Sequence, residues 1–188
     1  MITSKDIIFD TDPRIRMRCE PVAIPLSKED KQTVLDLHEY IINSQNPEFI
    51  EKDGGRSGVG LAAPQIGITK RMIAIHLQDI DGKLYSYKLI NPKIISHSVE
   101  QTFIPEGEGC LSVNYEVEGI VPRAKRIRVK AFDENGEPIE LKLQGYPAIV
   151  IQHEVDHLNG ILFYDHINKE NPFHIPKGAK PLQKNSSI

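Results

Sequence analysis

Two segments of the chain carry hydrophobic residues at the spacing of an α-helix. The first covers about 28–46, where Ser27 and Asp30 form a helix-start signal of the capping-box type. The second covers 148–158, where dense hydrophobic positions predict a buried helix that stops at Gly160. We therefore expect an amphipathic helix early in the chain and a buried helix late in it.

Alternating hydrophobic and polar positions predict strands in the middle of the chain. Two pairs of such segments flank turn sequences and predict hairpins, 72–77 with 85–90 and 126–132 with 138–143. Segment 161–167 is predicted to be a further strand. Strands between two helical segments indicate an α+β fold, with mixed or antiparallel β-sheets packed around the late helix and a second helix near the N-terminus.

Three segments rich in proline, glycine or small polar residues predict irregular chain. They are the arm up to Leu26, the loop 46–57, and a mobile C-terminal tail over about 172–188. The 188 residues contain no internal repeat, so we expect one domain over 1–188.

Composition narrows the class of protein. Hydrophobic residues make up 39% and charged residues 26%, which excludes a disordered or collagen-like chain. A net charge of −3 gives no electrostatic footprint for nucleic acid. No hydrophobic run approaches the roughly 18 residues of a membrane helix, and the first residues have no signal-peptide core. We therefore expect a cytoplasmic protein that contacts neither membrane nor specific nucleic acid sequences.

His153, Glu154 and His157 form an HExxH motif inside the predicted late helix. Residues four apart share one face of a helix, so both imidazoles can reach one metal ion. Glu154 lies beside them and is able to take a proton from metal-bound water. The alternative is a chance match, but two buried histidines without a ligand would be costly. We therefore expect this helix to be a central metal-binding helix.

The residues alone do not decide which side chain is the third ligand of such a site. A catalytic metal site usually has three protein ligands and an open position for water. The candidates are several carboxylates and Cys110, His166 and His174. Cys110 follows a glycine-rich stretch, and a thiolate is a strong ligand, but a lone cysteine is as often a small buried residue.

Segment 58–67 brings small residues together and allows close approach of its backbone to a ligand. Its Gly-x-Gly pattern is not the dinucleotide-binding Gly-x-Gly-x-x-Gly, so a nucleotide site is not favoured. Gln65 lies among hydrophobic neighbours and is a candidate to donate its amide N–H to an oxyanion. The alternative is a tight turn in which Gln65 bonds only to backbone.

Three segments together resemble the three signature motifs of the peptide deformylase family. They are GVGLAAPQ (58–65), EGCLS (108–112) and QHEVDH (152–157), in this order. The resemblance extends from about Ile7 to about Ile167 and is greatest to the longer of the two bacterial classes of the family. Asn114 and Tyr115 depart from the pattern, which affects contacts at the substrate rim.

The resemblance implies a single catalytic domain that removes formate from the N-formyl-methionine of new polypeptides. Its implied metal ligands are Cys110, His153 and His157. They would hold one divalent ion, Fe²⁺ in cells, with Zn²⁺, Ni²⁺ or Co²⁺ as substitutes. The implied catalytic groups are Glu154 as general base and acid, the Gln65 amide and Leu111 N–H as oxyanion donors, and the Gly60 backbone. Its implied partners are formylated nascent peptides and, transiently, the ribosome, for an enzyme that acts as a monomer.

The methionine side chain of such a substrate needs an apolar slot. Our candidates for its wall are Val59, Tyr146, Ile149 and Val150, the last two of which lie on the His153 side of the helix. The alternative for each is plain core packing. A further candidate is an ion pair of Arg123 with Asp156 that steadies the metal-binding helix; the alternative is a pair without a catalytic role.

Two other functions compete with this prediction. A zinc peptidase of the plain HExxH type would need a third histidine or glutamate downstream, and neither His166 nor His174 has the spacing of the extended motif. A metal-stabilised binding module would close its fourth ligand position with a protein group. The presence of Glu154 and Gln65 beside the predicted ligands favours an enzyme.

Overall fold

Two β-sheets form the framework of the computed structural model, which describes residues 1–183. The larger sheet has the order β1-β2-β3-β6-β7, with β1 Gly60–Ala62, β2 Met72–Gln78, β3 Leu84–His97, β6 Arg126–Phe132 and β7 Pro138–Gln144. The smaller sheet has the order β5-β4-β8, with β4 Gln101–Phe103, β5 Arg123–Ala124 and β8 Lys180–Pro181. Both predicted hairpins are confirmed, because β2 pairs antiparallel with β3 and β6 pairs antiparallel with β7.

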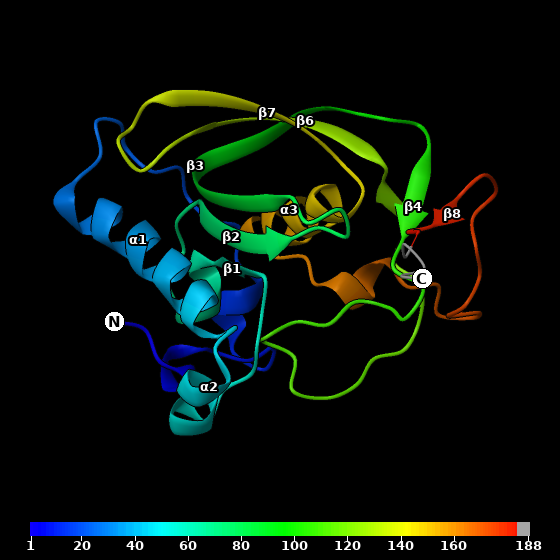
Figure 1. The fold of residues 1–188 in the computed structure, drawn as a ribbon, viewed down its shortest axis with the longest axis horizontal. Helices are drawn as coiled ribbons and strands as arrows, with labels where there is room; N and C mark the ends of the chain where they lie inside the picture. Colours follow the sequence, from blue (N-terminus) through cyan, green and yellow to red (C-terminus); the bar gives the residue numbers. More distant parts are fainter. Residues whose placement is uncertain (184–188) are drawn as a thin grey trace.

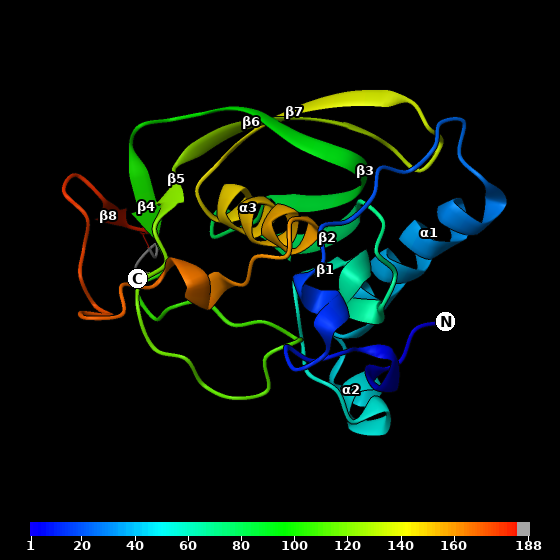
Figure 2. The ribbon, with the colours of Figure 1, turned by 180° about the vertical axis from the view of Figure 1, so that it is seen from behind.

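Within the described residues, three α-helices accompany the sheets. They are α1 Lys28–Asn43, α2 Pro47–Asp53 and α3 Tyr146–Leu158. Figures 1 and 2 show α3 inside the curve of the larger sheet, with α1 beyond β2. This arrangement confirms the predicted α+β fold, in which the sheets surround the HExxH helix. The start of α1 is also confirmed, since the Ser27 hydroxyl accepts a hydrogen bond from the Asp30 N–H at 3.0 Å.

The pleat of β2 explains why two helices cover the same sheet. Ile73 and Ile75 pack into a core with α3, whereas Met72 and Ala74 pack into a second core with α1. Successive side chains of a strand point to opposite faces, so one strand supplies both cores. The HExxH helix α3 is therefore buried against one face of the larger sheet.

The prediction of a loop over 46–57 is wrong in part, because the segment contains the short helix α2. Asn46 accepts a hydrogen bond from the Glu48 N–H, and Pro47 occupies the first turn, where its missing N–H costs nothing. Gly54 ends the helix in the left-handed region at φ 73°. Pro47 and Gly54, which predicted a loop, instead lie at the start and the end of this helix.

The prediction of a strand over 161–167 is wrong. The segment forms a 3-10 helix, Phe163–His166, and the Asp165 carboxylate accepts the Leu162 N–H at its start. A short hydrophobic run does not distinguish a strand from a buried turn. In this turn Phe163 stacks on the His153 ring, with centroids 6.1 Å apart.

The segment predicted as a mobile tail contacts the domain over its described part. β8 pairs in parallel with β4, and the Leu182 N–H donates to the Phe103 carbonyl at 2.8 Å. Residues 184–188 of that segment lie outside the described residues, and its mobility stays a prediction. No helix in the described part of the chain is long and apolar enough to cross a bilayer.

Candidate active site

α3 carries two of the three clustered metal-ligand side chains. His153 and His157 lie one helical turn apart, and both are buried. The segment before β5 brings Cys110 to them, with its Sγ 3.3 Å from His157 Nε2. One donor atom from each of the three residues lies within 4.8 Å of the other two. Of the candidates for a third ligand, Cys110 is therefore the one that joins the pair.

Glu108 fixes the orientation of His153. Its carboxylate lies 2.8 Å from His153 Nδ1 and also accepts two hydrogen bonds from Arg123. Burial raises the pKa of Glu108, but the hydrogen bonds from His153 and Arg123 outweigh burial and lower it to about 2. An ionised carboxylate only accepts, so His153 carries a proton on Nδ1 and donates it to Glu108, which fixes the orientation of its ring.

The predicted pair of Arg123 with Asp156 is confirmed at 2.6 Å, and Arg123 is buried. Asp156 also lies 2.7 Å from His166 Nε2. That contact holds His166 outside the ligand cluster, and His174 lies outside it too. Sequence reasoning missed the role of Glu108, although its place two residues before Cys110 was a signal for it.

The donor set fits a divalent metal ion. Burial lowers the pKa of His157 well below its ordinary value, so its imidazole is neutral, as a ligand must be. Two imidazoles and a cysteine sulfur suit ions such as Zn²⁺ or Fe²⁺, and three ligands leave a position for water. His157 Nδ1 has no hydrogen-bond partner in residues 1–183, so its ring orientation is set by packing.

Glu154 is a buried carboxylate that forms no ion pair within hydrogen-bond distance among residues 1–183. Its Oε2 finds no hydrogen-bond partner in the part of the chain described, and burial raises its pKa to about 7. Gly60 of β1 lies directly against it, because a Cβ at this position would come within 2.6 Å of Glu154 Oε1. Only glycine leaves room for the carboxylate here.

Gln65 bonds to side chains as well as to backbone, so the alternative in which it bonds only to backbone is wrong. Its Oε1 accepts the Ala62 N–H at 2.9 Å, as in a tight turn. This bond orients the amide, so Nε2 points to Ser112 Oγ at 3.1 Å and to Cys110 Sγ at 3.6 Å. The amide N–H is therefore held beside the metal-ligand cluster, where an oxyanion donor is needed.

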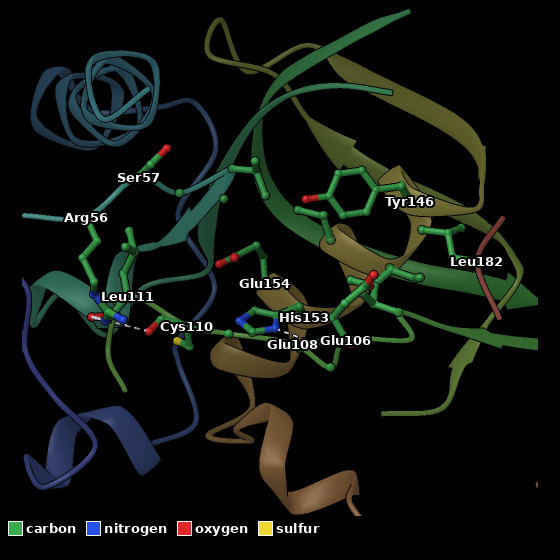
Figure 3. Close-up of a pocket in the computed structure, with 18 of the residues that line it drawn as sticks. Arg56, Ser57, Glu106, Glu108, Cys110, Leu111, Tyr146, His153, Glu154 and Leu182 are labelled. Carbon is green, nitrogen blue, oxygen red and sulfur yellow. Dashed lines mark hydrogen bonds and ion pairs between the residues drawn. The ribbon is translucent and has the colours of Figure 1, made fainter. Parts of the chain in front are cut away.

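A cavity of about 580 Å³ opens over this cluster. Figure 3 shows Cys110, His153 and Glu154 along one side of it and Tyr146 at its far end. All of the residues predicted to form the methionine slot line this cavity, namely Val59, Tyr146, Ile149 and Val150. Gly60 and Leu111 also line it. Every predicted site residue except His157 therefore lines this one cavity.

A Cys-His-His donor set, a buried carboxylate whose pKa is raised to about 7 and an oriented amide beside one cavity define a metal-dependent hydrolase. Comparison with known proteins identifies the family. The model of the polypeptide deformylase family matches residues 4–173. The chain therefore belongs to the polypeptide deformylase family. This confirms the predicted family and class of enzyme, a hydrolase that removes formyl groups from new polypeptides.

Similar proteins support the assignment over nearly the whole chain. The chain is 60% identical to peptide deformylase 2 of Bacillus anthracis over 98% of this chain and 100% of that protein. It is 57% identical to the peptide deformylase of Oceanobacillus iheyensis over 97% of this chain and 100% of the relative. The crystal structure of peptide deformylase from Thermus thermophilus matches with a TM-score of 0.69 and 34% identity, over 88% of this chain and 86% of that one.

Proposed function

We propose that Cys110, His153 and His157 hold one divalent ion, Fe²⁺ in cells, and that the cavity above them binds the N-formyl-methionine end of a nascent peptide. The observation that carries the proposal is the convergence of these three donors within 4.8 Å of one another, beside the unpaired carboxylate of Glu154. Zn²⁺, Ni²⁺ or Co²⁺ would suit the same donors.

Glu154 moves the protons of the reaction. When bound, the ion lowers the pKa of a coordinated water and polarises the formyl carbonyl. Glu154 accepts a proton from the attacking water and returns it to the amine that leaves. A pKa of about 7 suits both steps, because a group that titrates near the working pH both accepts and donates readily. Gly60 gives the carboxylate its space.

Two N–H groups of the chain stabilise the negative charge that develops on the formyl oxygen. Gln65 Nε2 is oriented by the bond from Ala62 to its Oε1. The Leu111 N–H follows Cys110 directly and donates to no acceptor within residues 1–183. Donors that are fixed before the reaction stabilise the transition state without a reorganisation cost.

The shape of the cavity recognises two parts of the substrate, the methionine side chain and the formyl group. Val59, Tyr146, Ile149 and Val150 provide hydrophobic surface for the methionine side chain. At the reacting end Gly60 is in close contact with Glu154, and we propose that the small residues of segment 58–63 form a narrow site that admits a formyl group and excludes a bulkier acyl group.

The setting of the enzyme follows from this substrate. We propose a single catalytic domain that acts in the cytoplasm as a monomer and meets its substrate during transient contact with the ribosome. We assign it to the longer of the two bacterial classes, on the length of chain before Gly58.

Metal loading tests the proposal. Protein freed of metal and titrated with Co²⁺ should bind one equivalent, show a thiolate-to-cobalt absorption band and gain deformylase turnover in parallel. Cys110→Ser should lose the band and the turnover, whereas Cys19→Ser, at a buried thiol away from the cavity, should keep both. A cobalt complex without the thiolate band in the unmodified protein would contradict the proposed ligand set.

A further inference from the structure

The segment between β4 and β5 carries a metal ligand but contains no helix or strand. Its local order at Cys110 is a turn, in which the Val113 N–H donates to the Cys110 carbonyl at 3.1 Å. Ser112 is tied down on one side of this turn, by the Asp10 N–H to its carbonyl at 3.0 Å and by Gln65 to its hydroxyl at 3.1 Å. The position of the Leu111 N–H depends on what holds this turn elsewhere.

Arg56 holds the turn from the other side. Its Nη2 lies 3.0 Å from the Cys110 carbonyl oxygen, 3.1 Å from that of Leu111 and 3.0 Å from that of Val113. One guanidinium therefore donates to three acceptors of the turn, and Figure 3 shows Arg56 directed toward Cys110 and Leu111. Within residues 1–183 the Leu111 carbonyl has Arg56 as its hydrogen-bond donor.

The backbone next to Arg56 is anchored to the end of α1. Two residues further on, the Gly58 N–H donates to Ser44 Oγ at 3.1 Å, and Gln45 Nε2 donates to the Gly58 carbonyl at 3.0 Å. Both partners lie at the end of α1. The guanidinium is thus connected to the framework of the fold, although its side chain is exposed at the rim.

The contact with the Cys110 carbonyl has a consequence for the Leu111 N–H. These two groups belong to the same peptide unit, which is planar and trans, so they point in opposite directions. A donor that fixes the carbonyl oxygen on the rim side also fixes the N–H on the other side, toward the metal-ligand cluster. The positive charge of Arg56 beside the Cys110 carbonyl oxygen also polarises the peptide unit, which strengthens the Leu111 N–H as a donor.

We propose that Arg56 is a positioning residue, which aims the Leu111 N–H at the oxyanion by holding the Cys110 carbonyl. The inference rests on the proposed function, since it assigns Leu111 N–H as an oxyanion donor. Arg56 acts on the transition state through this peptide unit and leaves the binding of methionine and of the ion to other residues.

Steady-state kinetics of Arg56→Ala, with the metal-loaded full chain and a formyl-Met peptide, tests the inference. We expect kcat to fall about 10- to 100-fold. This loss should not exceed the loss caused by removing a whole oxyanion donor, which lowers kcat about 10²–10³-fold. KM and the inhibition constant of the deformylated Met-peptide, which carries no oxyanion, should change by less than about 3-fold. Arg56→Lys should recover part of kcat, and guanidinium ion at non-denaturing concentration should recover part of it in Arg56→Ala.

The matched control is Arg128→Ala, which removes another exposed guanidinium, one that pairs with Glu140 on β6 and β7. It should keep kcat. A kcat of Arg56→Ala within about 2-fold of the active unmodified enzyme overturns the inference and leaves the proposed function standing. The inference is also overturned if the loss of kcat in Arg56→Ala is matched by a loss of metal or a lower thermal midpoint, and neither Arg56→Lys nor guanidinium ion recovers it. Arg56 would then only stabilise the turn. An unmodified enzyme that releases no formate overturns the proposed function itself.

Discussion

Glu154 and Glu108 are both buried carboxylates, yet their surroundings give them opposite properties. Glu108 pairs with Arg123 and His153, which lower its pKa to about 2 in spite of burial, so it stays ionised and orients a ligand. Glu154 has no such ion pair among residues 1–183, and burial raises its pKa to about 7. Environments that separate the pKa values of two carboxylates in this way suit the roles proposed for them, ring orientation for Glu108 and proton transfer for Glu154.

Replacing Glu154 with glutamine should abolish turnover and spare the metal site. The change keeps the size of the side chain and removes its ability to accept a proton, so we expect kcat to fall about 10²–10⁴-fold. Metal content per chain, measured on the same preparation, should stay at one equivalent because Glu154 is not a ligand. Turnover close to that of the unmodified enzyme would remove Glu154 from the reaction.

Gly60→Ala should displace the Glu154 carboxylate. The added Cβ would lie 2.6 Å from Glu154 Oε1, closer than such contacts occur, and a displacement on the order of 1 Å at a catalytic group can cost about 10²-fold in rate. Gly109→Ala is a control for folding, because its added Cβ meets no atom within 4 Å although it adjoins Cys110. Equal turnover in Gly60→Ala and in the unmodified enzyme would contradict the close contact.

At the scale of elements, His38 of α1 and His76 of β2 meet at one hydroxyl. Ser86 Oγ of β3 lies 2.7 Å from His38 Nε2 and 2.8 Å from His76 Nδ1. Burial lowers the pKa of His38 from 6.5 to about 4, with smaller contributions from the charges of Lys88 and His76, while Glu134 opposes the shift. Protonation of His38 therefore weakens the contact of α1 with the sheet.

The stability of the fold should depend on pH through His38. The unfolded chain takes up this proton below about pH 6.5, and the folded protein only below about pH 4. Between these values the unfolded state binds more protons, so the free energy of unfolding falls as the pH falls. Urea unfolding at several pH values should show a smaller fall for His38→Gln, whereas His97→Gln, at an exposed histidine, should follow the unmodified protein. Parallel curves for His38→Gln and the unmodified protein would contradict the assignment.

Long and strongly periodic elements could be predicted from the sequence, and short ones could not. Alternation over seven residues in β6 and β7, with a turn sequence between them, was sufficient for the hairpin. β4 and β8 are too short to show a period, and their pairing joins segments far apart in the chain. Segment 161–167 has the composition of a strand, but it forms a turn around Asp165.

The same limit applies to the candidate site. His153 and His157 could be predicted because helical spacing alone places them on one face. The contacts of Glu108 with His153 and of Arg56 with the Cys110 turn join residues about 45 and 54 positions apart. No local period connects such residues, so their partners become visible only when the sheet and the helix are assembled.

At the scale of the whole molecule, the fold keeps one side of the metal-ligand cluster in the core and opens the other to the cavity. The sheet and α3 exclude water from His157 and Glu154, both of which are buried. Cys110 lies at the cavity and is only partly buried. The thiol that we propose as a ligand is therefore accessible to dissolved oxygen from the cavity.

Exposure of the iron form to air should cost activity. Oxidation of Fe²⁺ or of the Cys110 thiolate removes a component of the site, so turnover should decay in air and persist under anaerobic conditions. The zinc form, whose ion has no redox chemistry, should lose turnover more slowly. Equal decay of the two forms, followed together with metal content, would contradict this origin of the loss.

The most direct test of the central claim is formate release from an N-formyl-Met peptide by anaerobically purified, iron-loaded protein, with the N-acetyl-Met peptide beside it. The account predicts formate from the formyl peptide and no acetate from the acetyl peptide, because the proposed acyl site admits only the smaller group. Release from neither peptide, with one equivalent of metal bound, would contradict the proposed reaction. Equal release from both would contradict the narrow site.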